Sequence, residues 1–318
     1  MPGPFAFHLE VRAGAPFELP IALSASTGDG PGELWLHLLG LALELSPSLD
    51  AAGFVDAVAA TDATELRRHL VGVYVPAWRE VAGAETLERA AVGDGAAASE
   101  LLRNDRYYAG KARDALGEIL PLSSAQTKRR VVATLRRFVE DVFAKQEAEA
   151  TAVLEENAAA QRRLAASLAP EAVIAAATGG YVYEPEPEFA RVVLVPHLAA
   201  APWLLLCQHR DARIICYAVE QSPGDEEEAV GERALRLGRA LSDERRIRIL
   251  RRLTAGEATL GELAEAAGLA KSTAHHHLAQ LRAAGLVTFR GNARGYWYGL
   301  RAEGLGEARA LLGELFVR

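Results

Sequence analysis

The chain has 318 residues, a formal net charge of −7, and hydrophobic side chains at half of its positions. This length predicts two or three domains with a sizeable core. The apolar runs are too short to span a bilayer and the first residues do not have the pattern of a signal peptide, so we expect a cytoplasmic protein. Two cysteines exclude a disulfide framework.

The first half of the chain is expected to be mostly helical. Residues 5–11 alternate apolar and polar side chains, which predicts a short strand. Residues 31–120 contain several short helical patterns that Gly and Pro interrupt. The stretch 124–168 is nearly free of helix breakers and predicts one long helix capped by Ser123 or Ser124.

A shorter helix and then a change of pattern follow. The next helix is expected to start at Pro170 and stop at Gly179–Gly180. Residues 181–219 are rich in Val, Ile, Tyr and Leu, and they predict the strands of a small antiparallel sheet. The acidic stretch 221–231 contains Gly and precedes a new pattern, so we interpret it as a linker. These boundaries predict a mostly helical effector or dimerisation domain at 1–220.

The two cysteines fall in the predicted strands. If Asp211–Ala212 is a two-residue turn, Cys207 and Cys216 lie directly opposite each other, with His209 on the same face as Cys207. Such a thiol pair is either a redox switch or metal site, or simply two small apolar residues in a sheet. The sequence leaves both interpretations open.

Positive charge is concentrated near the C-terminus. Residues 241–301 contain ten Lys or Arg against five Asp or Glu, a net charge of +5, so the remainder carries −12. A basic module within an acidic chain is typical of a DNA-binding domain attached to another unit.

The segment 232–318 has the order of a helix-turn-helix followed by a two-stranded wing. A helix at 232–240 precedes a second helix, capped by Ser242 and ended by Gly256. Gly268 supplies the tight turn before the helix 271–284. Apolar residues at helical spacing predict the buried faces of the two helices of the motif: Leu263, Ala264, Ala267, Ala274, Leu278 and Leu281.

The opposite face of the helix 271–284 is expected to read the major groove of duplex DNA. Lys271 and the first-turn amides are placed for phosphate, and His277 falls on the core side. The predicted DNA-contacting residues are Lys271, Ser272, Thr273, His275, His276 and Gln280 on the helix, and Arg290, Asn292 and Arg294 in the wing. Ala279 is also expected to face outward.

Several other residue groups have two interpretations. Successive helix residues point 100° apart, so the run His275–His277 is not expected to share a metal ion. Arginines at 245, 246, 251 and 252 either contact phosphates or form a solvated face. The aromatic residues Trp35, Trp78, Trp203, Tyr181 and Tyr183 either line a pocket or belong to the core.

The segment 235–317 resembles the ArsR/SmtB family of bacterial transcriptional regulators. The likeness rests on LSDERRIRIL, ELAEAAGLAKSTAHHHLAQLRAAGLV and the wing ending YWYGL. In metal-sensing members a cysteine pair precedes the ELAE-like segment, but here Thr259 and Gly261 occupy those positions. The last helix also has neither His nor Cys. We therefore expect no metal and no cofactor. The N-terminal region is similar to that of larger ArsR-like regulators with a helical domain of undefined role.

These observations predict a mainly α (α+β) protein with a C-terminal winged helix-turn-helix and a larger N-terminal helical domain. The predicted function is a homodimeric transcription regulator, as a repressor, that reads a palindromic operator and responds to an unknown small-molecule effector at the N-terminal domain. The alternatives are an enzyme or a protein-interaction scaffold carrying a winged-helix targeting domain. Residues 1–230 lack GxxxxGK[ST], GxGxxG after a strand, GxSxG and HExxH, so we expect no enzymatic activity.

Overall fold

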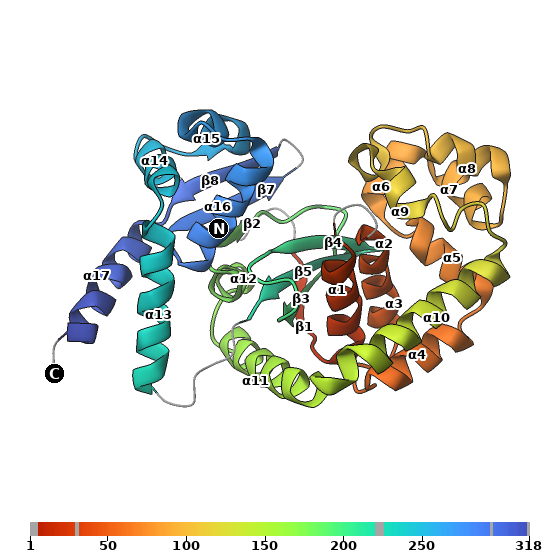
Figure 1. Cartoon of the computed structure of the whole chain (residues 1–318), viewed down its shortest axis with the longest axis horizontal. Helices are drawn as coiled ribbons and strands as arrows, with labels where there is room; N and C mark the ends of the chain where they lie inside the picture. Colours follow the sequence, from red (N-terminus) through yellow and green to blue (C-terminus); the bar gives the residue numbers. More distant parts are fainter. Residues whose placement is uncertain (1–5, 29–31, 220–225, 293–294, 317–318) are drawn as a thin grey trace.

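The computed structural model describes residues 6–28, 32–219, 226–292 and 295–316. We call residues 6–219 the N-terminal unit and residues 226–316 the C-terminal unit. Helices predominate and two four-stranded sheets complete the fold, so the mainly α (α+β) class is confirmed. In Figure 1 most helices of the N-terminal unit lie to one side of its sheet and the C-terminal unit lies to the other. No helix in the described ranges is long and apolar enough to cross a membrane.

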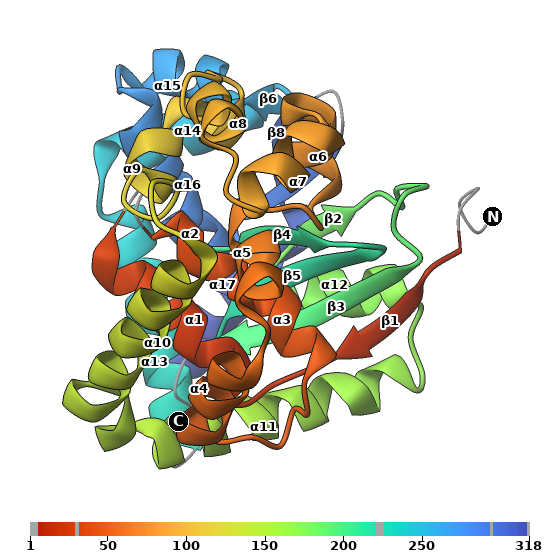
Figure 2. The same ribbon diagram turned by 90° about the vertical axis from the view of Figure 1, so that its right-hand side faces the viewer.

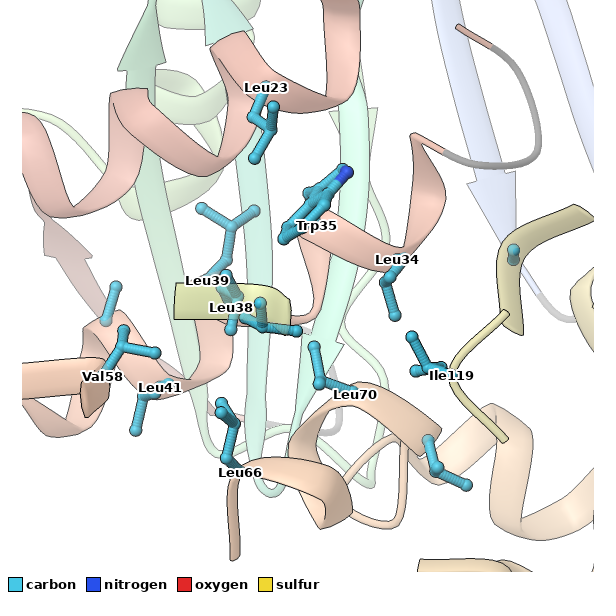
Figure 3. Close-up of a cluster of buried hydrophobic side chains, with 14 of the residues drawn as sticks. Leu23, Leu34, Trp35, Leu38, Leu39, Leu41, Val58, Leu66, Leu70 and Ile119 are labelled. Carbon is cyan, nitrogen blue, oxygen red and sulfur yellow. The ribbon is translucent and has the colours of Figure 1, made fainter. Parts of the chain in front are cut away.

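Short helices build most of the N-terminal unit. They are α1 (Ala15–Thr27), α2 (Glu33–Leu36), α3 (Leu38–Glu44), α4 (Ala51–Ala60), α5 (Ala63–Val71), α6 (Pro76–Ala82), α7 (Ala84–Ala91), α8 (Gly95–Leu101), η1 (Tyr107–Gly110) and α9 (Ala112–Leu116). Asp50, Asp62 and Asp94 each cap a helix by accepting hydrogen bonds from its first backbone amides. Leu38 of α3 and Leu66 of α5 meet in the shared core (Figure 3).

The predicted long helix at 124–168 is interrupted. The segment forms α10 (Ser124–Asp141), η2 (Phe143–Lys145) and α11 (Glu147–Ala165). Ser123 makes the predicted cap, in a reciprocal capping box with Gln126. The helix breaks at Val142, whose φ is −126°, and this break directs Phe143 into the core, where it is 1% exposed. A sequence without Gly or Pro gives no local signal for such a break, because core packing determines it.

The sheet of the N-terminal unit is mixed, whereas the sequence predicts an antiparallel one. Its strands are β1 (His8–Val11), β3 (Arg191–His197), β5 (Ala212–Ala218) and β4 (Leu205–His209), in that spatial order. The tightly connected strands β4 and β5 are antiparallel, but β1, β3 and β5 run parallel. Long connections, partly helical, link these parallel strands, and only such connections allow parallel pairing.

Both faces of this sheet are covered. Val193 and Ile214 pack into the core of the N-terminal helices, while their neighbours Val192 and Ile215 pack on the opposite face. That second core includes α12 (Pro170–Thr178), which ends as predicted, with Gly179 in the left-handed conformation. Figure 2 shows the four strands side by side, with α3 on one side and α12 on the other. Two-sided burial explains why β3 is almost continuously apolar.

The first strand of the 181–219 region belongs to a different sheet. Strand β2 (Tyr181–Tyr183) pairs in parallel with β7 (Val287–Asn292) of the C-terminal unit. The second sheet also contains β8 (Gly295–Leu300) and β6 (Ala258–Thr259), in the order β2-β7-β8-β6. The two units are therefore joined by backbone hydrogen bonds as well as by the chain.

The C-terminal unit contains α13 (Glu226–Leu241), α14 (Glu244–Leu253), α15 (Leu260–Ala267), α16 (Lys271–Ala283) and α17 (Ala302–Phe316). Residues 221–225 of the predicted linker lie outside the described residues, and 226–231 belong to α13. The predicted cap of α14 shifts by one residue to Asp243. Helices α13 and α17 pack against each other.

Candidate DNA-binding site

The turn between α15 and α16 forms as the sequence predicts. Thr259 and Glu262 make a capping box at the start of α15. Gly268 ends this helix at a φ of 67°, a conformation that other residues adopt at a cost. Leu263 and Ala267 are buried in the core of the unit. This arrangement fixes the direction in which α16 leaves the turn.

Helix α16 has a buried face and an exposed face. Ala274, Leu278 and Leu281 are at most 1% exposed, which anchors the helix on the core. The exposed residues are Lys271, Ser272, Thr273, His275 and His276. The N-cap is Ala270, and no side chain caps this fully described helix. Its first-turn amides are therefore oriented toward solvent, where an anion such as phosphate can bind.

His277 and Gln280 belong to a buried network around Arg246. This arginine donates to the carbonyls of Arg239 (2.6 Å) and Ala240 (2.8 Å), and it contacts His277 Nδ1 at 3.3 Å. The predicted position of His277 on the core side agrees with its 7% exposure, and burial lowers its pKa. Arg246 therefore joins α13, α14 and α16, and the phosphate contact considered for it is replaced by a structural role.

Gln280 has a different environment from the one the sequence suggests. Its Oε1 accepts a hydrogen bond from Arg246, and its Nε2 lies 2.9 Å from Nε2 of His276. Since an amide nitrogen donates, the imidazole nitrogen accepts, which places the proton of a neutral His276 on Nδ1. Gln280 thus orients His276 on the exposed face.

The wing carries one described arginine, which is already paired. Arg290 binds Glu257 at 2.6 Å and Glu184 at 3.1 Å, and its guanidinium lies 5.1 Å from the centre of the Trp297 ring. Its positive charge is therefore largely balanced by two carboxylates. Asn292 ends β7, but its side chain lies outside the description, as does the whole of Arg294.

The N-terminal unit contacts α16 directly, which the sequence does not predict. The Trp203 ring lies 5.1 Å from the His275 ring and 5.8 Å from the His276 ring. One to two turns further, Arg282 is 7% exposed and donates to the carbonyls of Thr178 and of Pro202 (2.7 Å). Two parts of the chain far apart in sequence make this contact, so no local pattern signals it.

Ala279 lies between these contacts on the same stripe of α16. It was expected to face outward, yet it is 7% exposed. His275, Ala279 and Arg282 are separated by four and three residues and so share one side of the helix. This side is partly covered by the segment that contains Trp203.

The predicted alignment of the two cysteines is wrong by two residues. The turn falls at Arg210–Asp211, where Arg210 has a φ of 51°, and Cys207 pairs with Ile214. The thiols are diagonal neighbours and both are free. The hydrogen bond with the Cys207 thiol, together with burial, holds the pKa of Cys216 well above its usual value. A raised pKa keeps Cys216 in the unreactive thiol form.

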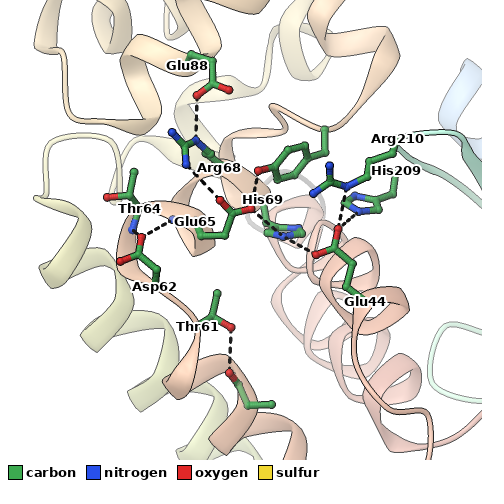
Figure 4. A network of polar contacts seen from close by, with 12 residues as sticks. Glu44, Thr61, Asp62, Thr64, Glu65, Arg68, His69, Glu88, His209 and Arg210 are labelled. Carbon is green, nitrogen blue, oxygen red and sulfur yellow. Dashed lines mark hydrogen bonds and ion pairs between the residues drawn. The ribbon is translucent and has the colours of Figure 1, made fainter.

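A polar network ties helices α3 and α5 to the end of β4 (Figure 4). Glu44 accepts hydrogen bonds from His209 and Arg210, each at 2.8 Å. His69 lies 3.7 Å from Glu44 and 3.8 Å from Glu65, and its ring stacks on that of His209. Among the described residues no group of three or more His, Cys, Asp or Glu side chains has a geometry that would hold a metal ion.

Residues 241–289 match the family described as "Helix-turn-helix domain". This segment contains α14, α15, α16 and the first three residues of the wing strand β7. The order of helices and the strand pair β7–β8 make the C-terminal unit a winged helix-turn-helix. Such a domain binds DNA in transcription regulators, so the chain is a DNA-binding transcription regulator.

Solved structures similar to this chain match less than a third of it. NolR from Sinorhizobium fredii is 29% identical over 30% of this chain and 97% of its own, with a TM-score of 0.25. A second similar structure is the homodimeric winged helix-turn-helix DNA-binding domain of Mb0332 from Mycobacterium bovis, described as a possible ArsR-family transcriptional regulator. It is 29% identical over 30% of this chain and 89% of its own, with a TM-score of 0.25. HlyU from Vibrio cholerae is 35% identical over 29% of this chain and 98% of its own, with a TM-score of 0.23. No curated protein matches the chain.

Proposed function

We propose that this protein is a dimeric, cytoplasmic repressor that binds a palindromic operator through α16 and acts by binding rather than by catalysis. The observation that carries the proposal is the exposed first half of α16, with Lys271 and Ser272 at its start and His275 and His276 one turn later. A major groove accommodates one helix, and polar side chains on its outer face reach base edges. Repression is favoured over activation because occluding a promoter requires only binding.

The test begins with genomic fragments that the purified protein retains, from which an operator is defined. The double variant His275→Ala/His276→Ala should lose about tenfold or more in affinity for that operator, because base contacts are worth about 1–3 kcal/mol each. Its affinity for unrelated DNA should change little. Arg137→Ala, an exposed change on α10, is the control. Equal affinity of the double variant and the wild type for the operator would contradict the assigned role of α16.

The proposed dimer rests on apolar side chains that remain exposed on the C-terminal unit. Leu305, Leu312 and Leu315 of α17 are 46%, 46% and 40% exposed, and Leu241 at the end of α13 is 39% exposed. The three leucines of α17 are spaced at seven and three residues, so they share one face of the helix. A second copy of the same surface would cover them, which is how most homodimers associate. The Mycobacterium bovis domain is described as homodimeric.

Light scattering measures this association directly. Leu312→Glu should convert the dimer to a monomer at micromolar concentration, because it places a charge in an apolar interface. Leu168→Glu is the matched control, since Leu168 is 44% exposed on the N-terminal unit. A Leu312→Glu variant that keeps the mass of the wild type would exclude this face.

The proposed regulation by the N-terminal unit rests on the contact between Trp203 and α16. The ring occupies space beside His275 and His276, so a movement of this segment changes what the helix presents to DNA. Trp203→Ala should raise operator affinity about threefold to tenfold, the range expected for losing one aromatic contact. Trp203→Phe keeps a ring and should stay near the wild type. A loss of affinity in Trp203→Ala would instead make Trp203 a DNA contact.

A further inference from the structure

A cavity of about 650 Å³ lies between the N-terminal unit and α13. Its size suits a small organic molecule, since ligand pockets typically span about 300–1,000 Å³. Much of the wall is apolar and comes from distant parts of the chain: Phe143, Ala150, Leu198, Val219 and Leu235. A ligand here would touch both units at once.

Glu18 of α1 is the unusual residue of this wall. It is 3% exposed, and its carboxylate accepts hydrogen bonds from the backbone amides of Leu198 (3.1 Å) and Ala199 (2.8 Å). No cationic side chain in the described parts of the chain is paired with it. Burial raises the pKa of Glu18 to about 7, which reflects the cost of an ionised carboxylate without a counter-charge.

Among the described lining residues, the other charged groups of the cavity are two of each sign. Arg236 and Arg239 of α13 lie on the wall together with Glu149 of α11 and Glu232 of α13. Glu18 is therefore the group that leaves the cavity with an excess of negative charge when ionised. A cavity whose wall combines apolar side chains with one buried, unpaired carboxylate favours a molecule that has an apolar body and one positive charge.

We propose that this cavity binds a small organic cation, an amine or ammonium compound with an apolar body, whose charge rests on the Glu18 carboxylate. The binding itself is independent of DNA. Its regulatory meaning rests on the function proposed above, since the ligand would be the effector that acts on α16.

Two short connections lead from the cavity to α16. Glu18 holds the amides of Leu198 and Ala199, which begin the segment that ends at Trp203 beside the exposed histidines of α16. On the other wall, Arg239 lines the cavity and its carbonyl accepts a hydrogen bond from Arg246. Arg246 in turn holds the buried network of α16. A ligand that repositions either wall therefore biases the orientation of α16.

The test uses two probes with the same ring and opposite charges, phenethylamine and 3-phenylpropionate. Isothermal titration at pH 8 with the full chain should show binding of the amine and at least tenfold weaker binding of the carboxylate. Glu18→Gln should weaken the amine at least tenfold, whereas Glu232→Gln, an exposed residue of the same wall, should change it less than threefold. Equal binding of both probes, or an unchanged Glu18→Gln variant, would overturn the proposal.

A second variant tests the proposal independently, in case Glu18→Gln fails to fold. Leu235 is 60% exposed, so Leu235→Trp fills the cavity from its α13 wall without disturbing the core. It should abolish amine binding, and full binding in this variant would also overturn the proposal. Gel shifts with the operator then measure regulation: the amine should change affinity in the wild type and not in Glu18→Gln. Titration without DNA keeps a failure of ligand binding distinct from a failure of the proposed function.

Discussion

Most histidine side chains in the described N-terminal unit are buried, whereas two of the three on α16 are exposed. His69, His197 and His209 are buried within the N-terminal unit, whereas His275 and His276 are exposed on α16. Burial lowers the pKa of His69 and of His197 to about 4. The buried imidazoles of His69 and His197 therefore contribute to the interior as neutral groups, and their protonation acts on stability. His275 and His276 of α16 are instead positioned for contact with another molecule.

A buried arginine also contributes to the interior of the N-terminal unit. Arg67 is 1% exposed and donates to the carbonyls of Ala90 (3.2 Å) and Leu120 (2.8 Å) and to the Thr127 hydroxyl (3.3 Å). Arg67→Met would leave these acceptors without a donor in the interior, so the free energy of unfolding should fall by about 4 kcal/mol. Urea titration measures it, and this is the largest effect that we expect.

Arg68, the next residue on the same helix, supplies the matched control. It forms ion pairs with Glu65 and Glu88 at the surface, with a third of its side chain exposed. Arg68→Met should cost no more than about 1 kcal/mol, the usual range for exposed pairs. Equal free energies of unfolding for the two variants would contradict a larger stabilising contribution from the buried hydrogen bonds of Arg67 than from the surface ion pairs of Arg68.

The histidine comparison predicts an acid-sensitive N-terminal unit. His197 is fully buried, and its Nε2 donates to the carbonyl of Trp203 at 3.1 Å. Because its pKa falls from 6.5 unfolded to about 4 folded, the unfolded chain takes up the proton first. Its contribution to stability is then complete above pH 6.5 and lost as the pH falls toward 4, by roughly 3 kcal/mol.

Unfolding followed between pH 7 and pH 4 tests this expectation. His197→Gln should have a flatter dependence of stability on pH than the wild type, while His276→Gln on the exposed face should follow the wild type. Glu18 acts in the opposite direction, since its raised pKa favours the folded state at low pH, so Glu18→Gln should steepen the acid loss. Parallel curves for His197→Gln and the wild type would contradict a buried neutral imidazole.

The smallest expected effect concerns the exposed start of α16. Lys271 is placed for a phosphate, so Lys271→Ala should weaken operator binding by about tenfold or less and lower the salt slope of the logarithm of affinity by about one. Lys145→Ala, an exposed change on η2, should leave the slope unchanged. Gel shifts at several salt concentrations measure both, and an unchanged slope for Lys271→Ala would remove the phosphate contact.

Local patterns predicted the C-terminal unit well for a physical reason. The buried face of α16, the turn at Gly268 and the inward His277 all depend on spacing within one or two helical turns. The outer side of α16 was predicted less well, since His275 and Arg282 on it contact the segment of Pro202 and Trp203, more than seventy residues earlier. Helical spacing predicts which side faces the core of the unit but not what covers the other side.

For the N-terminal unit, the sequence predicted only the structural class, a mostly helical domain with a small sheet, and not how its elements pack. The composition of residues 181–219 predicted strands of one small sheet, but the pairing of β2 with β7 was missed, because pairing is set by packing across the whole chain. The break at Val142 lacks a sequence signal, since it serves the burial of Phe143. The unpaired Glu18 carboxylate was likewise missed, since its burial becomes evident only when α1 meets the end of β3.

The parallel pair of β2 and β7 has a consequence for how the chain can be divided. A cut between the two units would leave β2 on one fragment and its partner strand on the other, and Arg282 would remain opposite its two carbonyl acceptors. The fragments should then stay associated without a covalent link, as in a complementation assay. During synthesis β2 emerges about a hundred residues before β7, so β2 has no partner strand until β7 follows.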